Sequence, residues 1–125
     1  MLMSGLIGDP VAHSLSPSMH NAAFQALGID ARYELWHTVT ADLLLRIASL
    51  RAEGILGANV TVPHKGTVIP LLDDVSETAR RIGSVNTVIA RDGRLLGDNT
   101  DAYGFSRALE EATGGAVPRL ALVVG

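Results

Sequence analysis

The stretch NVTVPHK, residues 59–65, combines strand-like alternation with side chains that do not suit a core. Its two valines alternate with Asn59 and Thr61, and its proline, which cannot donate a ladder hydrogen bond, stops the strand just before Lys65. Amides and hydroxyls both donate and accept hydrogen bonds, so they match the alcohols of a polyhydroxylated ligand. A lysine beside a carboxylate can move a proton. The stretch therefore indicates a small-molecule site with a candidate acid–base group.

Polar residues also stand beside three other strand-like segments. Ser14 and Ser16 follow the first of them. Asn86 begins another, and Asp101 comes after the second strand of a hairpin. Because ligands of open α/β sheets bind outside the carboxyl ends of the strands, these groups form one candidate set with Lys65, provided that Asn86 and Asp101 reach the same edge of the sheet. Each group alone also fits a structural role: Ser16 is a good helix N-cap, and Asp101 suits the positive end of a helix.

Composition excludes several classes of function. The chain has 125 residues with 47% hydrophobic residues, which is typical of one globular domain. A net charge of −3 without a basic run argues against nucleic acid as a partner. Cysteine is absent and the four histidines lack paired ligand spacing, so we expect neither a disulfide nor a metal site. No secretory signal or membrane-length apolar run occurs, so a cytoplasmic protein without membrane contact is expected.

Hydrophobic periodicity and turn residues predict strands that alternate with helices. The expected strands span 2–8, 32–39, 56–62, 85–90, 94–96 and 120–124, and Asp92-Gly93 forms a hairpin turn. The expected helices span 16–28, 40–53, 74–83 and 100–112. Ser16 is the predicted cap of the first and an Asp74-x-x-Glu77 capping box starts the third. The pattern predicts an α/β domain whose sheet is mostly parallel, is flanked by helices and contains one antiparallel hairpin.

Four motifs resemble the substrate-binding domain of shikimate dehydrogenase. They are GDPVAHSLSPSMHNAAF, GANVTVPHK, GSVNTV and GDNTDAYGF, and they follow the order of that family from Gly8 to Phe105. The resemblance implies a two-domain oxidoreductase that reduces 3-dehydroshikimate to shikimate with NADPH, on the route to chorismate and the aromatic amino acids.

The resemblance also assigns roles to individual residues. It implies that Ser14 and Ser16 hold the substrate carboxylate and that Lys65 and Asp101 are the catalytic pair. The positions that it matches to contacts with the ring hydroxyls are Asn59, Thr61, Lys65, Asn86 and Asp101.

The C-terminal residues resemble the beginning of a second domain. LALVVG matches the first strand of an NADP-binding Rossmann domain and ends at Gly125, the one residue assigned to cofactor binding. We therefore expect a substrate-binding domain over 1–113, and a linker with a truncated Rossmann strand over 114–125. NADP is expected to bind mainly to a second domain, so the isolated chain is expected to be inactive. A homodimer is a possible assembly.

Two alternatives stay open at this stage. One is a quinate or aminoshikimate dehydrogenase of the same family, although the Ser14-x-Ser16 spacing is more similar to that of the shikimate-preferring enzymes. The other is a domain that binds shikimate without catalysing its reaction, which is what the isolated chain is expected to do.

Overall fold

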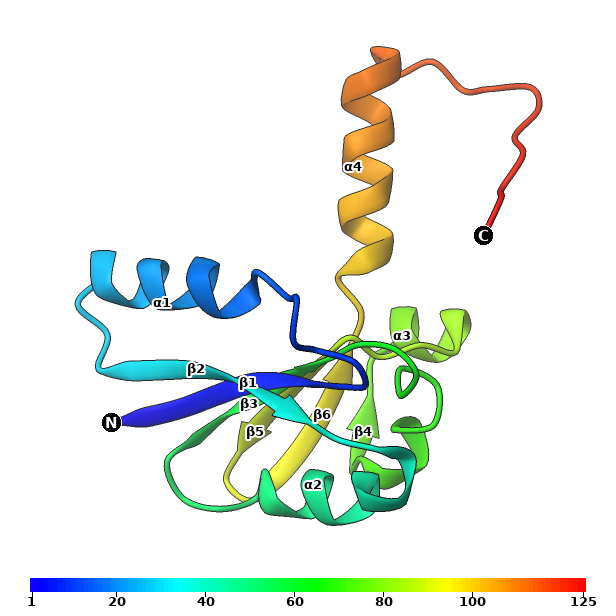
Figure 1. The fold of residues 1–125 in the computed structure, drawn as a ribbon. Helices are drawn as coiled ribbons and strands as arrows, with labels where there is room; N and C mark the ends of the chain where they lie inside the picture. Colours follow the sequence, from blue (N-terminus) through cyan, green and yellow to red (C-terminus); the bar gives the residue numbers. More distant parts are fainter.

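A six-stranded sheet organises the chain in the computed structural model, which describes residues 1–125 (Figure 1). The strands are β1 (Leu2–Gly8), β2 (Ala31–His37), β3 (Ile55–Val60), β4 (Asp74–Val75), β5 (Thr87–Arg91) and β6 (Arg94–Asp98). The helices are α1 (Ser16–Ala26), η1 (Thr40–Asp42), α2 (Leu43–Ser49), η2 (Ile69–Leu71), α3 (Glu77–Ile82) and α4 (Asp101–Thr113). The predicted α/β fold, with helices around a mostly parallel sheet, is confirmed.

One strand runs against all the others. The order across the sheet is β2-β1-β3-β5-β6-β4, and β5 is antiparallel to both of its neighbours, β3 and β6. The pairs β1–β2, β1–β3 and β4–β6 are parallel. The beginning of β5 therefore lies at the same edge as the carboxyl ends of the remaining strands. The Asp92-Gly93 turn that joins β5 to β6 has positive φ at both residues, as predicted for a tight hairpin.

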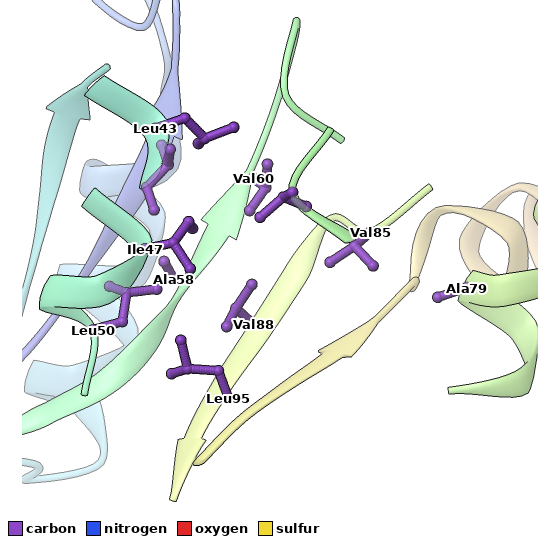
Figure 2. Packing of buried hydrophobic residues seen from close by; sticks show 11 residues of the cluster. Leu43, Ile47, Leu50, Ala58, Val60, Ala79, Val85, Val88 and Leu95 are labelled. Atoms are coloured by element: carbon purple, nitrogen blue, oxygen red, sulfur yellow. The ribbon is translucent and has the colours of Figure 1, made fainter. Parts of the chain in front are cut away.

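The main core lies between α2 and one face of the sheet (Figure 2). Leu43, Ile47 and Leu50 follow helical spacing and are buried against strand residues of alternating register. Full burial of each such side chain contributes about 1.5–3 kcal/mol, so this layer supplies much of the stability of the domain. The strand residues that meet them are Ala58 and Val60 of β3, Val88 of β5 and Leu95 of β6.

The opposite face of the sheet is only partly covered. In Figure 1, α1 lies over the β2 side of the sheet, on the face opposite α2. A small cluster of Leu6, Val11 and Tyr33 packs there with Phe24 of α1. Since successive strand residues alternate in direction, Asn59 of β3 points to this second face, while its neighbours Ala58 and Val60 fill the main core.

Two predicted helix caps are wrong. Ser16 is the first residue of α1, and its N-cap is Leu15, which makes no side-chain cap hydrogen bond. The Asp74-x-x-Glu77 capping box does not form, because Asp74 starts the short strand β4 beside β6. Ser76 caps α3 instead, and its hydroxyl accepts a hydrogen bond from the Ala79 amide at 3.1 Å.

The apolar faces predicted for two helices are exposed. Met19 of α1 and Leu27, which caps its C-terminal end, are 62% and 72% exposed, because that helix contacts the sheet through the neighbouring side chains of Asn21 and Phe24. Helix α4 has no buried residue, and Phe105 is 70% exposed. In Figure 1, α4 projects away from the sheet. The side chains on these two helix faces are apolar, as predicted, but they do not pack into the core of this chain.

The strand predicted for residues 120–124 does not form. Leu120 is 90% exposed, and residues 120–125 belong to no helix or strand. A strand is stable only when its backbone groups pair with a neighbouring strand, and none lies beside this segment. No helix in the structure combines the length and the apolar character that a membrane span requires.

Candidate functional site

The candidate residues come together at the edge where β1, β3 and β6 end and β5 begins. The topology places the loop that follows β1, with Ser14, near the turn after β3, with Lys65. Backbone hydrogen bonds tie these segments: the Thr61 amide donates to the Ile7 carbonyl at 2.9 Å, and the Val85 amide donates to the Lys65 carbonyl at 2.8 Å. The expected convergence at one sheet edge is therefore present.

Lys65 and Asp101 form an ion pair, although they lie 36 positions apart in sequence. The ammonium Nζ donates to Oδ2 of Asp101 at 2.7 Å, with the two side chains 31% and 55% exposed. Asp101 is the first residue of α4, but it does not cap that helix. The N-cap of α4 is Thr100, and the Ala102 amide donates to Oδ1 of Asn99 at 3.1 Å, so the Asp101 carboxylate is available to Lys65.

A buried histidine fixes the turn that presents Lys65. His64 is fully buried, and its Nε2 lies 2.5 Å from the Thr38 carbonyl. Because a carbonyl only accepts, Nε2 donates this bond, which ties the turn to the end of β2. The His64 amide also donates to the Thr61 carbonyl at 3.0 Å. The residue before Lys65 is thereby held from two sides, and the side chain of Lys65 projects from a fixed point.

The two serines form a hydroxyl pair at the start of α1. Ser14 Oγ donates to Ser16 Oγ at 3.1 Å, and the Ser16 amide donates to Ser14 Oγ at 3.2 Å. Both residues are half-buried. Neutral donors of this kind can turn toward an anionic oxygen, so the pair is suited to a carboxylate that keeps its charge.

Asn86 links the beginning of β5 to the residue before Asp101. Its side chain is buried, and Nδ2 donates to Thr100 Oγ1 at 2.8 Å, while the Thr100 amide donates back to Oδ1 at 3.0 Å. The Thr87 hydroxyl donates to the same Oδ1 at 3.0 Å. These bonds hold the start of α4, and with it Asp101, against the sheet edge.

Asn59 lies beneath these groups, with its amide engaged on both sides. Oδ1 accepts from the Tyr33 hydroxyl at 2.8 Å. Nδ2 donates to the Asn86 carbonyl and to Thr87 Oγ1, at 3.3 Å each. This geometry suits a supporting role at least as well as a direct contact with a ligand.

Sequence reasoning missed Tyr33, Thr87 and Thr100. Thr87 and Thr100 stand inside the motifs GSVNTV and GDNTDAYGF, so their positions beside Asn86 and Asp101 were the available signal. Tyr33 had no local signal beyond its place in a strand, because its hydroxyl partner is 26 positions away.

Gly125 does not join the site. It is exposed in the terminal segment, far along the chain from the strand ends that carry the other candidates. A dinucleotide site needs a helix N-terminus or a glycine-rich cradle after a paired strand, and residues 116–125 form neither. The residues present therefore do not fit NADP on their own.

The comparisons with known proteins match most of the chain. A family model described as the shikimate dehydrogenase substrate binding domain matches residues 6–88. A curated relative from Geobacillus kaustophilus, named shikimate dehydrogenase (NADP(+)), is 61% identical over 107 residues, which are 86% of this chain. The chain spans only 39% of the length of that relative.

Solved structures share the fold. Shikimate 5-dehydrogenase from Thermus thermophilus, crystallised with NADP(H) and shikimate, matches with a TM-score of 0.84 and 46% identity, over 90% of this chain and 43% of that one. A more distant neighbour is the 5-ketofructose reductase of a Gluconobacter strain, with a TM-score of 0.83 and 35% identity over 88% of this chain and 40% of that one.

Proposed function

Since the chain belongs to the shikimate dehydrogenase substrate-binding domain family, we propose that it binds shikimate and 3-dehydroshikimate as the substrate domain of an NADP-dependent dehydrogenase. The observation that carries this proposal is the Lys65–Asp101 pair at 2.7 Å, at the edge where the serine pair and the amides also lie. That edge offers one cation, one anion and several neutral donors and acceptors. A carboxylated polyol with one ketone has complementary groups for each of them.

In the proposed reduction, Lys65 acts as the general acid. Its ammonium donates a hydrogen bond, and then a proton, to the ketone oxygen of 3-dehydroshikimate, which becomes the new hydroxyl of shikimate. NADPH, held by a second domain, would supply the hydride to the ketone carbon. Asp101 holds the ammonium in place and accepts a hydrogen bond from a ring hydroxyl. In the reverse direction the neutral amine of Lys65 takes the hydroxyl proton. General acid–base catalysis of this kind contributes about 10²–10⁴ in rate.

The remaining groups are proposed to bind and orient the substrate. Ser14 and Ser16 donate to the carboxylate, and each hydrogen bond to a charged group is worth about 1.5–3 kcal/mol, or about 10–150-fold in affinity. Thr61 and Asn86 contact the ring hydroxyls, and Asn59 supports them from below. A ring held at its carboxylate and at its hydroxyls presents its ketone to Lys65 in one orientation.

In this proposal, turnover of the substrate requires a second domain that binds NADP. Residues 1–113 form the substrate domain in this proposal, and residues 114–125 connect it to an NADP-binding domain that begins with the 120–124 segment. The isolated chain would then bind substrate without turning it over. The complete dehydrogenase would act in the synthesis of chorismate and the aromatic amino acids. A homodimer is its proposed assembly.

A second candidate differs only in the ring that is bound. The neighbour named 5-ketofructose reductase indicates that this fold accompanies more than one keto substrate. A quinate or aminoshikimate dehydrogenase would use the same Lys65 chemistry with other contacts to the ring substituents.

An NMR titration of this chain separates these candidates. Backbone amides would be followed with shikimate, and with quinate and NADP⁺ in parallel samples. The proposal expects shifts at residues 14–16, 61–65, 86 and 101 with shikimate, weaker shifts with quinate, and none with NADP⁺. Stronger binding of quinate would favour the second candidate. An absence of shifts with millimolar shikimate, joined to an inactive complete enzyme, would overturn the proposal.

A further inference from the structure

A buried tyrosine hydroxyl lies between the serine pair and the amides of the site. Tyr33 of β2 is only 2% exposed, and its hydroxyl donates to Oδ1 of Asn59 on β3 at 2.8 Å. Burial raises the pKa of Tyr33 to about 12, and the nearby Ser16 hydroxyl opposes that rise. The phenol therefore keeps its proton at physiological pH, and it is always able to donate to Asn59.

Tyr33 is itself held by the helix that carries the serine pair. Asn21 of α1 clamps its backbone: Nδ2 donates to the Tyr33 carbonyl at 3.0 Å, and the Tyr33 amide donates to Oδ1 at 2.8 Å. The His20 ring stacks on the Tyr33 ring, with centroids 4.2 Å apart and planes 7° from parallel. Tyr33 thus fixes the position of α1, and of Ser16 at its start, relative to the sheet.

From Asn59 the hydrogen bonds continue to the other wall of the site. Asn59 Nδ2 donates to Thr87 Oγ1 at 3.3 Å, Thr87 donates to Asn86 Oδ1 at 3.0 Å, and Asn86 Nδ2 donates to Thr100 Oγ1 at 2.8 Å. An amide can turn over and exchange its oxygen and nitrogen. A permanent donor at Oδ1 of Asn59 favours one orientation of that amide, which agrees with the bond from its Nδ2 to the Asn86 carbonyl at 3.3 Å. The orientation of the Asn86 amide agrees with the Thr100 amide, which donates to its Oδ1 at 3.0 Å.

We propose that Tyr33 is a positioning residue of the site: its hydroxyl holds the Asn59 amide in place and, through Thr87, supports Asn86 beside the start of α4. The inference rests on the proposed function, because the groups positioned in this way are those that would bind the substrate ring. Tyr33 does not donate a proton to the substrate in this role. It keeps Asn59 and, through Thr87, the side chain of Asn86 in their observed positions.

Tyr33→Phe is the decisive variant, because it removes one oxygen and keeps the ring that packs on His20. The matched control is Tyr103→Phe, in which an exposed phenol of α4 loses its hydroxyl. Side-chain amide signals of Asn59 and Asn86 would first be recorded by NMR in the ligand-free chain. Tyr33→Phe is expected to move both signals, whereas Tyr103→Phe leaves them in place. Unmoved signals in Tyr33→Phe would overturn the inference.

Affinity for shikimate gives the second measurement. The loss of one neutral hydrogen bond predicts that Tyr33→Phe raises the Kd about three- to tenfold. If Tyr33 acts through Asn59, the double variant Tyr33→Phe/Asn59→Ala binds no more weakly than Asn59→Ala alone. Additive losses, or a Kd for Tyr33→Phe equal to that of wild type, would overturn the inference.

The two proposals can fail separately. If the wild-type chain does not bind shikimate and the complete enzyme does not turn it over, the proposed function fails. The positioning role of Tyr33 is then decided by the amide signals alone. If wild type binds shikimate and Tyr33→Phe changes only the thermal unfolding midpoint, the proposed function stands and Tyr33 is merely a core residue.

Discussion

Replacement of Lys65 by methionine separates catalysis from stability more sharply than any other single change. Lys65→Met keeps an unbranched apolar stem and removes the ammonium that meets Asp101 at 2.7 Å. The two side chains are 31% and 55% exposed, and exposed ion pairs contribute only about 0.2–1 kcal/mol to folding. We therefore expect the free energy of unfolding to change by no more than about 1 kcal/mol.

The effect on catalysis should be several times larger. Loss of a general acid costs about 10²–10⁴ in rate. At about 1.36 kcal/mol for each factor of ten, this equals roughly 2.7–5.4 kcal/mol of transition-state stabilisation. Lys65→Met should thus lower kcat of the complete enzyme by at least about 100-fold while the protein remains folded.

Steady-state reduction of 3-dehydroshikimate by the complete enzyme, beside urea unfolding of the same preparations, measures both quantities. Arg107→Met is the matched control, because it breaks another exposed ion pair, with Glu110 on α4, at a similar distance of 2.7 Å. That control should keep full activity. A loss of less than about tenfold in Lys65→Met would refute the general-acid role, whatever its effect on stability.

Lys65 is also the only lysine of the chain, so amine-selective labelling reports on it and on the N-terminus alone.

Two further predictions concern packing and pH. In Gly8→Ala the new methyl group would collide with the Thr61 side chain and lie 3.0 Å from the Val62 carbonyl, so we expect weaker shikimate binding by NMR titration and a loss of about 1–3 kcal/mol in urea unfolding. The control Gly104→Ala has open space and should stabilise α4, and equal behaviour of the two variants would contradict the packing argument. The hydrogen bond from Arg51 holds the pKa of Asp73 below its usual range, so the ionised form favours the folded state at neutral pH, and this stabilisation is lost as pH falls through the lowered pKa. The unfolding midpoint of Asp73→Asn should lie below that of wild type at neutral pH and converge with it below about pH 4, and a constant difference in acid would show that charge is not the cause.

The sequence predicted the framework of the site because that framework depends on local periodicity. Helical spacing in residues 43–50 predicts the burial of Leu43, Ile47 and Leu50, and the structure confirms it, although Leu44 is exposed. Alternation in residues 59–62 correctly places Val60 in the main core, but Val62 lies beyond the strand and is exposed. The pairing of Lys65 with Asp101 was expected from the resemblance of their motifs to those of the family, and the ion pair is present although the two residues lie 36 positions apart.

Features that depend on partners distant in sequence were not predictable. Ser16 looks like a cap, yet its hydroxyl pairs with Ser14, because α1 starts one residue earlier than a serine cap would require. The 120–124 segment has strand composition but has no strand to pair with. Tyr33 looks like any alternating strand residue, and only the pairing of β2 and β3 on either side of β1 brings its hydroxyl to Asn59.

The position of Asp101 in the first turn of α4 places the Lys65–Asp101 ion pair at the pivot about which that helix would tilt. Helix α4 has 13 residues, none of them buried, and is therefore about 20 Å long. A tilt of about 10° about its first turn would carry its far end through roughly 3.5 Å, as follows from that length. The carboxylate at the pivot would hardly move, because displacement grows with distance from the pivot. Under such a tilt, the far end of α4 would move toward or away from the sheet edge, while the contact between Lys65 and Asp101 would persist.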